Sequence, residues 1–242
     1  MAELAYNLNR SDNGYAQARI SQSNWTRVGS PQTGSLGFSM NVYHRPVGNG
    51  QYDYVFAFRG TVDLPGWWNN LNQVIFGSES GQIQEAERLV ESILNDISRD
   101  INEIHFTGHS LGGYLSQWME ARIRINCGTE ANCQFRGTSH ETSAVTFNAP
   151  GFAAGTTGTT SFHIAKNEKI ANSSSFTSIR NYQISSFLGD GMLVDPVVDW
   201  GTQLGNSVRV SSTNYNCNHI LSACHALAEF FDILRFRSDF LP

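Results

Sequence analysis

Basic residues are sparse in this sequence of 242 residues, and so are prolines, of which there are six. The 16 Lys and Arg are outnumbered by 21 Asp and Glu, which gives a formal charge of -5, and they are scattered along the chain. Proteins that bind nucleic acid usually carry a concentrated basic patch. Nucleic acid is therefore not expected as a partner.

Long apolar runs are also missing. No stretch reaches the roughly 18 apolar residues that a membrane-spanning helix requires. Residues 1–19 are too polar for a secretory signal peptide. We therefore expect neither a transmembrane helix nor a signal peptide within this sequence.

Only four cysteines are present, in two close pairs, Cys127 with Cys133 and Cys217 with Cys224. Neither pair has the Cys-x2-Cys spacing of a zinc knuckle. Two local disulfides are the favoured interpretation, with free thiols and a metal site as the alternatives. Disulfides imply an oxidising compartment, so a secreted or otherwise extracytoplasmic location is expected.

Strand-like and helix-like segments alternate along the middle of the chain. Period-two patterns predict strands at 38–47 and 52–58, joined by a Gly-Asn-Gly hairpin turn. Helical spacing predicts helices at 82–101, from 111 to about 125, and at 220–236. Further strands are predicted at 104–107, 143–147, 179–184 and 207–211. This order predicts an α/β fold with a central, mostly parallel sheet and helices on both faces, in a single domain spanning 1–242.

The sequence Gly-His-Ser-Leu-Gly-Gly at 108–113 joins a predicted strand to a predicted helix. A serine at such a sharp turn has a strained backbone, and the flanking segments pass so close that side chains two positions away would collide. Gly108 and Gly112 remove those side chains. The pattern indicates that Ser110 is a covalent nucleophile.

The helix that follows Ser110 directs its free amide groups at the position where an oxyanion would form. Its apolar residues recur at helical spacing, with polar Ser116, Gln117 and Glu120 between them. The apolar positions are Leu111, Tyr114, Leu115, Trp118 and Met119.

A serine nucleophile needs an imidazole base, and in a doubly wound sheet the expected chain order is Ser, then Asp, then His. His225 is favoured because it begins an apolar helical run, and His219 is the alternative. The remaining histidines are less suitable. His44 and His105 precede the strand-to-helix turn at 108–113, here called the elbow, and His109 lies beside Ser110. His140 is expected toward the opposite end of the sheet, and His163 precedes any candidate acid.

The acid that orients the base is expected after the strand at 179–184. Asp195 is the best placed candidate because Pro196 follows it and commonly ends an element. Asp190 and Asp199 are the alternatives, although each also suits an ordinary turn or loop position.

Three motifs resemble those of the α/β-hydrolase family and, within it, the class 3 lipases and their bacterial lipase-like relatives. They are Phe-Arg-Gly-Thr at 58–61, the elbow at 108–113 and Asn-Ala-Pro-Gly at 148–151. The resemblance implies that Thr61 and Leu111 supply the oxyanion hole through their backbone amides. The stretch from Asp195 through residues 201–206 to His225 resembles the acid and base end of the lipase-like branch. No cofactor and no metal are expected.

Residues 67–76 place Trp68, Leu71 and Ile75 on one helical face, between Thr61 and the first long helix. The resemblance implies a mobile lid that makes transient contact with a lipid surface, and the alternative is an ordinary helix packed on the core. An apolar wall near Ser110 favours an acyl chain over a charged substrate.

These features predict a serine ester hydrolase of lipase or phospholipase type, acting on lipid or other acyl esters through an acyl-enzyme on Ser110. An acyltransferase would use the same residues with an alcohol in place of water. A catalytically inactive lipase-like binding protein is the alternative from a different class.

Overall fold

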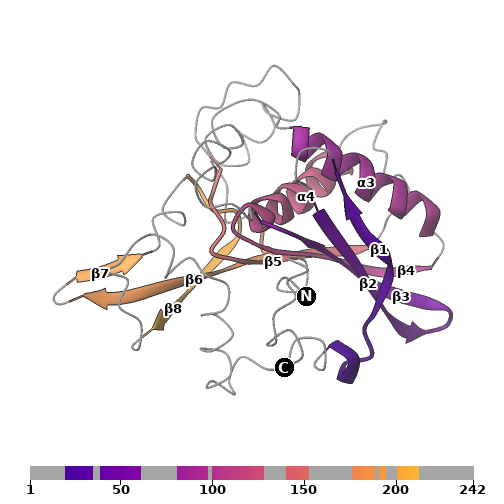
Figure 1. Ribbon diagram of the computed structural model, residues 1–242, viewed down its shortest axis with the longest axis horizontal. Coiled ribbons are helices and arrows are strands. Elements are labelled where there is room, and N and C mark those ends of the chain that lie inside the picture. The colour runs from indigo at the N-terminus through magenta and orange to yellow at the C-terminus, as the bar shows by residue number, and fades with distance from the viewer. Residues whose placement is uncertain are drawn as a thin grey trace.

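A computed structural model describes residues 20–34, 39–60, 81–97, 100–127, 140–152, 176–188, 191–194 and 201–212. These residues form one eight-stranded sheet, against which two long helices pack (Figure 1). The strand order is β1-β2-β3-β4-β5-β6-β7, with β8 paired to β6.

The first three strands are antiparallel. They are β1 (Thr26–Thr33), β2 (Ser39–Gly48) and β3 (Gln51–Phe58). The predicted hairpin turn is confirmed, with φ values of 54° at Asn49 and 74° at Gly50, a region that asparagine and glycine tolerate well. Strand β1 was not predicted, because it is largely exposed and lacks the alternation that marks a half-buried strand.

The centre of the sheet is parallel, as predicted. Strand β4 (Ile101–His109) pairs in parallel with β3 and with β5 (Glu141–Phe147), and β5 pairs in parallel with β6 (Ile179–Leu188). Strand β8 (Asn206–Ser212) is parallel to β6 on its other side. The α/β architecture is therefore confirmed.

Strand β6 continues beyond the end of β5 and pairs there with the antiparallel β7 (Gly191–Val194). The β6–β7 hairpin extends away from the two helices (Figure 1). Strand β7 was not predicted, although the Gly-Asp-Gly sequence at 189–191 is a hairpin signal. Because β7 runs antiparallel to β6, its last residue, Val194, lies nearer to the C-terminal end of β5 than its first residue does.

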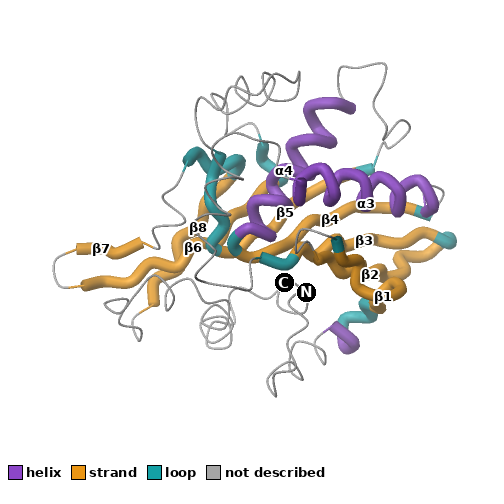
Figure 2. The backbone as a smooth tube through the Cα atoms, turned by 45° about the horizontal axis from the view of Figure 1, so that its top comes forward, coloured by secondary structure: helices purple, strands orange, loops and turns teal. Residues whose placement is uncertain are grey.

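Helices α3 (Gly81–Ile97) and α4 (Leu111–Cys127) lie on the same face of the sheet (Figure 2). Their apolar side chains and those of β2 to β6 form the main core. The helix predicted at 82–101 was too long at its C-terminal end, because α3 ends at Ile97. Ile101 is 1% exposed and pairs with Tyr52 of β3, so sheet pairing outweighs the helical spacing at this position.

Helix α4 is buried on all sides from residue 111 to residue 121. The polar residues between its apolar positions, Ser116, Gln117 and Glu120, are each 0% exposed. Each has a polar partner, as buried polar groups require. The Ser116 hydroxyl donates to Gly112 O (2.8 Å), and Ser178 Oγ donates to Glu120 Oε1 (2.6 Å).

The opposite face of the sheet carries a smaller core of Tyr43, Val55 and Ala57, against which Ile20 and Trp25 pack. Ile20 begins a helical turn at 20–22. Within the described ranges, no helix has the length and apolar character needed to cross a membrane.

Several predicted features lie outside the described residues. These are the closing helix at 220–236, the segment at 67–76 and three of the four cysteines, Cys133, Cys217 and Cys224.

Candidate active site

Ser110 occupies a sharp turn between β4 and α4, as predicted. Its φ is 56°, in the left-handed region that non-glycine residues adopt only when the surroundings enforce it. The Ser110 N–H donates to Phe147 O (3.0 Å) and its carbonyl accepts from Tyr114 N–H (3.1 Å), which starts the helix. A mostly parallel sheet whose central strand ends in such an elbow has the α/β-hydrolase fold.

Close backbone contacts around the elbow explain its glycines. A Cβ on Gly108 would lie 2.3 Å from Gly112 C, and a Cβ on Gly113 would lie 2.6 Å from Ala149 Cβ. The collision predicted between positions 108 and 112 is therefore confirmed. The turn can close only because neither residue has a side chain.

The elbow also contacts the segment that follows β3. A Cβ on Gly112 would lie 2.3 Å from Phe58 O and 3.0 Å from Arg59 C. Gly60 is buried, and the described chain stops one residue before Thr61. Leu111, the first residue of α4, is 2% exposed. The Phe-Arg-Gly part of the predicted oxyanion motif thus lies against the first turn of α4.

The Ser110 hydroxyl is buried, and among the described residues its Oγ has no hydrogen-bond partner. The serine as a whole is 2% exposed. His109 is 5% exposed at the end of β4 and is therefore a packed residue, as expected.

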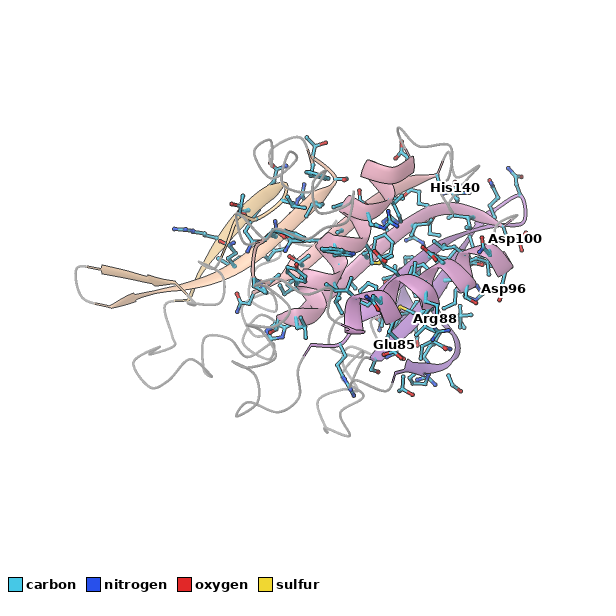
Figure 3. The ribbon with its side chains drawn as sticks, turned by 90° about the horizontal axis from the view of Figure 1, so that it is seen from above. Glu85, Arg88, Asp96, Asp100 and His140 are labelled. Carbon is cyan, nitrogen blue, oxygen red and sulfur yellow. The ribbon has the colours of Figure 1, made fainter. Side chains whose placement is uncertain are left out.

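Three further histidines are described, and none of them hydrogen-bonds the Ser110 hydroxyl. His44 is in β2 and stacks on Tyr52, with ring centroids 4.9 Å apart. His105 is within β4, five residues before Ser110. His140 precedes β5 and lies with Asp100 at the end of the sheet where β5 and β4 begin (Figure 3). Ser110 follows the other end of β4.

His105 takes part in a polar cluster on the face opposite the long helices. Its Nδ1 lies 2.8 Å from Ser143 Oγ, and its Nε2 lies 3.3 Å from Glu103 Oε2. Burial lowers the pKa of His105 below its ordinary value, against the opposing effect of the Glu103 and Asp53 carboxylates. The imidazole therefore tends to be neutral in the folded protein.

The predicted acid and base lie outside the described residues, as do their alternatives: Asp195, Asp190, Asp199, His225, His219 and His163. The chain on both sides of residues 195–200 is described. Val194 ends β7, and beyond the gap Phe152 and Thr202 exchange two backbone hydrogen bonds of 2.8 Å. The segment with the predicted acid therefore connects β7 to a loop that lies beside residues following β5.

In the described part of the chain, no three His, Cys, Asp or Glu side chains are grouped as a metal site would require. The expectation that neither metal nor cofactor takes part stays a prediction.

The phospholipase-like family described as the Tle-like phospholipase domain matches residues 1–132. This chain belongs to that family. The matched part includes Ser110, the elbow glycines and the Phe-Arg-Gly-Thr motif. No curated protein matches the sequence.

Three solved lipase structures are similar to this phospholipase-like chain. The M37 lipase is 14% identical, with a TM-score of 0.47, over 75% of this chain and 65% of that one. The lipase from Rhizopus microsporus var. chinensis is 12% identical (TM-score 0.45; 75% and 62%), and lipase II from Rhizopus niveus is 14% identical (TM-score 0.41; 75% and 66%). The likeness spans just under two thirds of each of these lipases.

Proposed function

We propose that this phospholipase-like chain is a serine hydrolase that cleaves acyl esters of lipids through an acyl-enzyme on Ser110. The observation that carries the proposal is the elbow itself. Ser110 has a strained backbone with φ of 56°, its Oγ lacks a hydrogen-bond partner among the described residues, and the amino end of α4 begins at the next residue. A strained nucleophile at a helix start has a catalytic use and no evident structural one.

In the proposed reaction, Ser110 Oγ attacks the ester carbonyl, and its proton passes to His225. The carbonyl oxygen becomes an oxyanion, which the backbone amides of Thr61 and Leu111 would stabilise. The contact of Gly112 with Phe58 and Arg59 supports this role, because it brings the segment before Thr61 beside the start of α4. The helix dipole favours negative charge at the same position.

His225 then donates its proton to the departing alcohol, which leaves the acyl group on Ser110. Water attacks the acyl-enzyme with His225 as the base, and the free acid is released. Asp195 would hold the imidazole in the tautomer that accepts the serine proton. Its position between β7 and the loop beside residues 149–152 supports its selection over Asp190, which lies in the β6–β7 connection.

The family description, which names a phospholipase, supports the proposed substrate class. We propose a phospholipid or another lipid ester, with transient contact between the protein and the lipid surface. One sheet contains strands from within and beyond the matched part of the chain, which supports a single domain over residues 1–242.

The first experiment compares wild type with Ser110→Ala on p-nitrophenyl esters from acetate to palmitate and on phosphatidylcholine vesicles. We expect Ser110→Ala to lower kcat/KM by roughly ten-thousand-fold or more. Ser116→Ala is the matched control, because Ser116 is a buried serine of α4 whose hydroxyl bonds Gly112 O within the helix. Equal activity of Ser110→Ala and wild type would refute the proposal.

The base and acid are tested in the same assay with two matched sets. We expect His225→Ala to abolish hydrolysis and His219→Ala to retain it, with Asp195→Asn impaired far more than Asp190→Asn or Asp199→Asn. If His219→Ala loses more activity than His225→Ala, the base would be reassigned. If Asp190→Asn or Asp199→Asn loses more activity than Asp195→Asn, the acid would be reassigned. Either result would leave the proposed role of Ser110 unchanged. Adding a soluble alcohol as acceptor distinguishes the acyltransferase, which would form a new ester in place of the free acid.

A further inference from the structure

Four described residues other than glycine have a backbone φ in the left-handed region: Asn24, Asn49, Ser110 and Asn148. Asn24 and Asn49 are exposed and lie in turns, where asparagine commonly adopts this conformation. Asn148 differs from them, because it is 0% exposed and directly follows β5. A buried left-handed residue outside a surface turn persists only when the surrounding structure enforces it.

The peptide unit before Asn148 joins Ser110 to strand β6. Phe147 O accepts the Ser110 N–H (3.0 Å), and the Asn148 N–H donates to Tyr182 O (2.9 Å). Phe147 O and Asn148 N belong to the same planar peptide unit. The φ of Asn148, 43°, is the torsion about the bond directly after this unit. This torsion therefore relates the orientation of the peptide unit to the direction of the chain that follows.

The chain that follows Asn148 is anchored by two glutamine side chains. Gln117 Nε2, on α4, donates to Pro150 O (3.3 Å), and Gln203 Nε2 donates to Ala149 O (2.7 Å). These carbonyl groups lie outside the strands, where no ladder satisfies them. The two residues after Asn148 are therefore held by hydrogen bonds from two different segments.

The same loop packs against the elbow. A Cβ on Gly113 would lie 2.6 Å from Ala149 Cβ, so the loop touches the first turn of α4. Residues 148–152 are all buried, which leaves them little room to move. With the loop held in place, a change of φ at Asn148 would have to rotate the peptide unit that binds Ser110.

We infer that Asn148 is a positioning residue, whose left-handed backbone orients the peptide unit that holds the amide of Ser110. The inference rests on the proposed function, because it takes Ser110 as the nucleophile. Ser110 is itself strained, with a φ of 56°, so its conformation depends on contacts such as the bond to Phe147 O. Misplacement of a catalytic group by about 1 Å lowers rates roughly a hundredfold.

The test compares Asn148→Gly with Asn148→Ala. Both remove the amide side chain, but glycine adopts a positive φ readily and alanine resists it. We expect Asn148→Ala to lower kcat on a p-nitrophenyl ester about 10- to 100-fold, with KM changing less than about twofold. Asn148→Gly should stay within about threefold of the kcat of wild type, because it keeps the backbone conformation. Assays are run well below the Tm of each variant.

Asn49→Ala is the matched control, because Asn49 has a φ of 54° in the exposed turn between β2 and β3. It puts alanine in the same backbone conformation away from Ser110, so Tm should fall while kcat stays that of wild type. Covalent labelling of Ser110 by a fluorophosphonate reports the nucleophile without turnover. Labelling should slow in Asn148→Ala and keep the rate of wild type in Asn49→Ala.

Two results would overturn the inference. If the side chain of Asn148 matters and its backbone does not, the glycine and alanine variants lose activity alike. If the role is purely structural, Asn148→Ala lowers Tm but keeps the kcat and labelling rate of wild type. Should Asn148→Ala fail to fold, Asn148→Ser takes its place, since serine also disfavours the left-handed region but keeps a polar group in the buried site.

The two proposals fail in different ways. If Ser110→Ala and wild type are equally inactive, the proposed function fails and the role of Asn148 in it fails too. If hydrolysis depends on Ser110 but Asn148→Ala has the kcat of wild type, only the inference about Asn148 is wrong.

Discussion

Gly112 and Phe58 are in direct backbone contact, since a Cβ on Gly112 would lie 2.3 Å from the carbonyl oxygen of Phe58. Phe58 ends β3, and Gly112 is in the first turn of α4. This contact brings the Phe-Arg-Gly-Thr motif beside the elbow, although about fifty residues separate them in the sequence. The proposed oxyanion hole therefore requires a glycine at position 112, although this residue lies within a helix.

Gly112→Ala is therefore expected to destabilise the protein. Helix propensity alone favours alanine over glycine by about 1 kcal/mol. The overlap with Phe58 should outweigh this gain and lower the free energy of unfolding by about 1–3 kcal/mol. Urea denaturation measures the change, with Ser116→Ala as a change in the same helix without overlap. If the Gly112→Ala variant is more stable than wild type, the backbone contact between Gly112 and Phe58 is looser than described.

Glu87 connects the two long helices. Its Oε1 accepts from Trp118 Nε1 (2.8 Å) and from Arg122 Nε (3.1 Å), and the Trp118 side chain is buried. Glu87→Ala should cost about 1.5–3 kcal/mol, because the indole N–H would lose its acceptor. Glu87→Gln keeps an oxygen acceptor and should cost less in the same urea titration. Equal losses for the two variants would contradict a role for the acceptor.

His105 should make stability depend on pH. Burial lowers the pKa of His105 from 6.5 in the folded protein. As the pH falls below about 6.5, the unfolded chain binds a proton that the folded chain resists, so stability is full above that pH and declines below it.

Comparing Tm at pH 7.5 and pH 5.5 checks this prediction. His105→Gln should lose less stability between the two pH values than wild type. Ser143→Ala removes the hydroxyl 2.8 Å from Nδ1 but keeps the imidazole, so it should retain the pH dependence of wild type. An unchanged pH dependence in His105→Gln would disprove the role of this histidine.

The four cysteines are predicted to form two local disulfides, Cys127 with Cys133 and Cys217 with Cys224. Protein purified from an oxidising compartment should then show no reactive thiol when denatured, and four after reduction. Peptide mapping of the unreduced protein should recover the two local pairs. Four thiols in the denatured, unreduced protein would favour the free-thiol alternative instead.

The elbow was predictable from sequence because its constraints are local. Gly108, Ser110 and Gly112 fall within five residues, and the collision that excludes side chains depends only on the geometry of one turn. The central strands were predicted for a similar reason, since strands buried on both faces have a strong apolar signal. The errors arose where partners distant in sequence decide the structure. Ile101 continues the helical spacing of α3 but pairs with Tyr52 in the sheet.

By itself, the sequence determined the strand-to-helix turn at Ser110 and the parallel α/β architecture, because each depends on residues close together in the chain. Only the tertiary structure decided the surroundings of Gln117. The sequence places Gln117 among the polar residues between the apolar positions of α4, and the structure shows that it is buried and binds backbone groups of Pro150 and Leu204. The physical reason is that these backbone groups lie outside the strands and need hydrogen-bond partners. Their positions depend on segments far from α4 in the sequence, so the helix sequence alone does not reveal them.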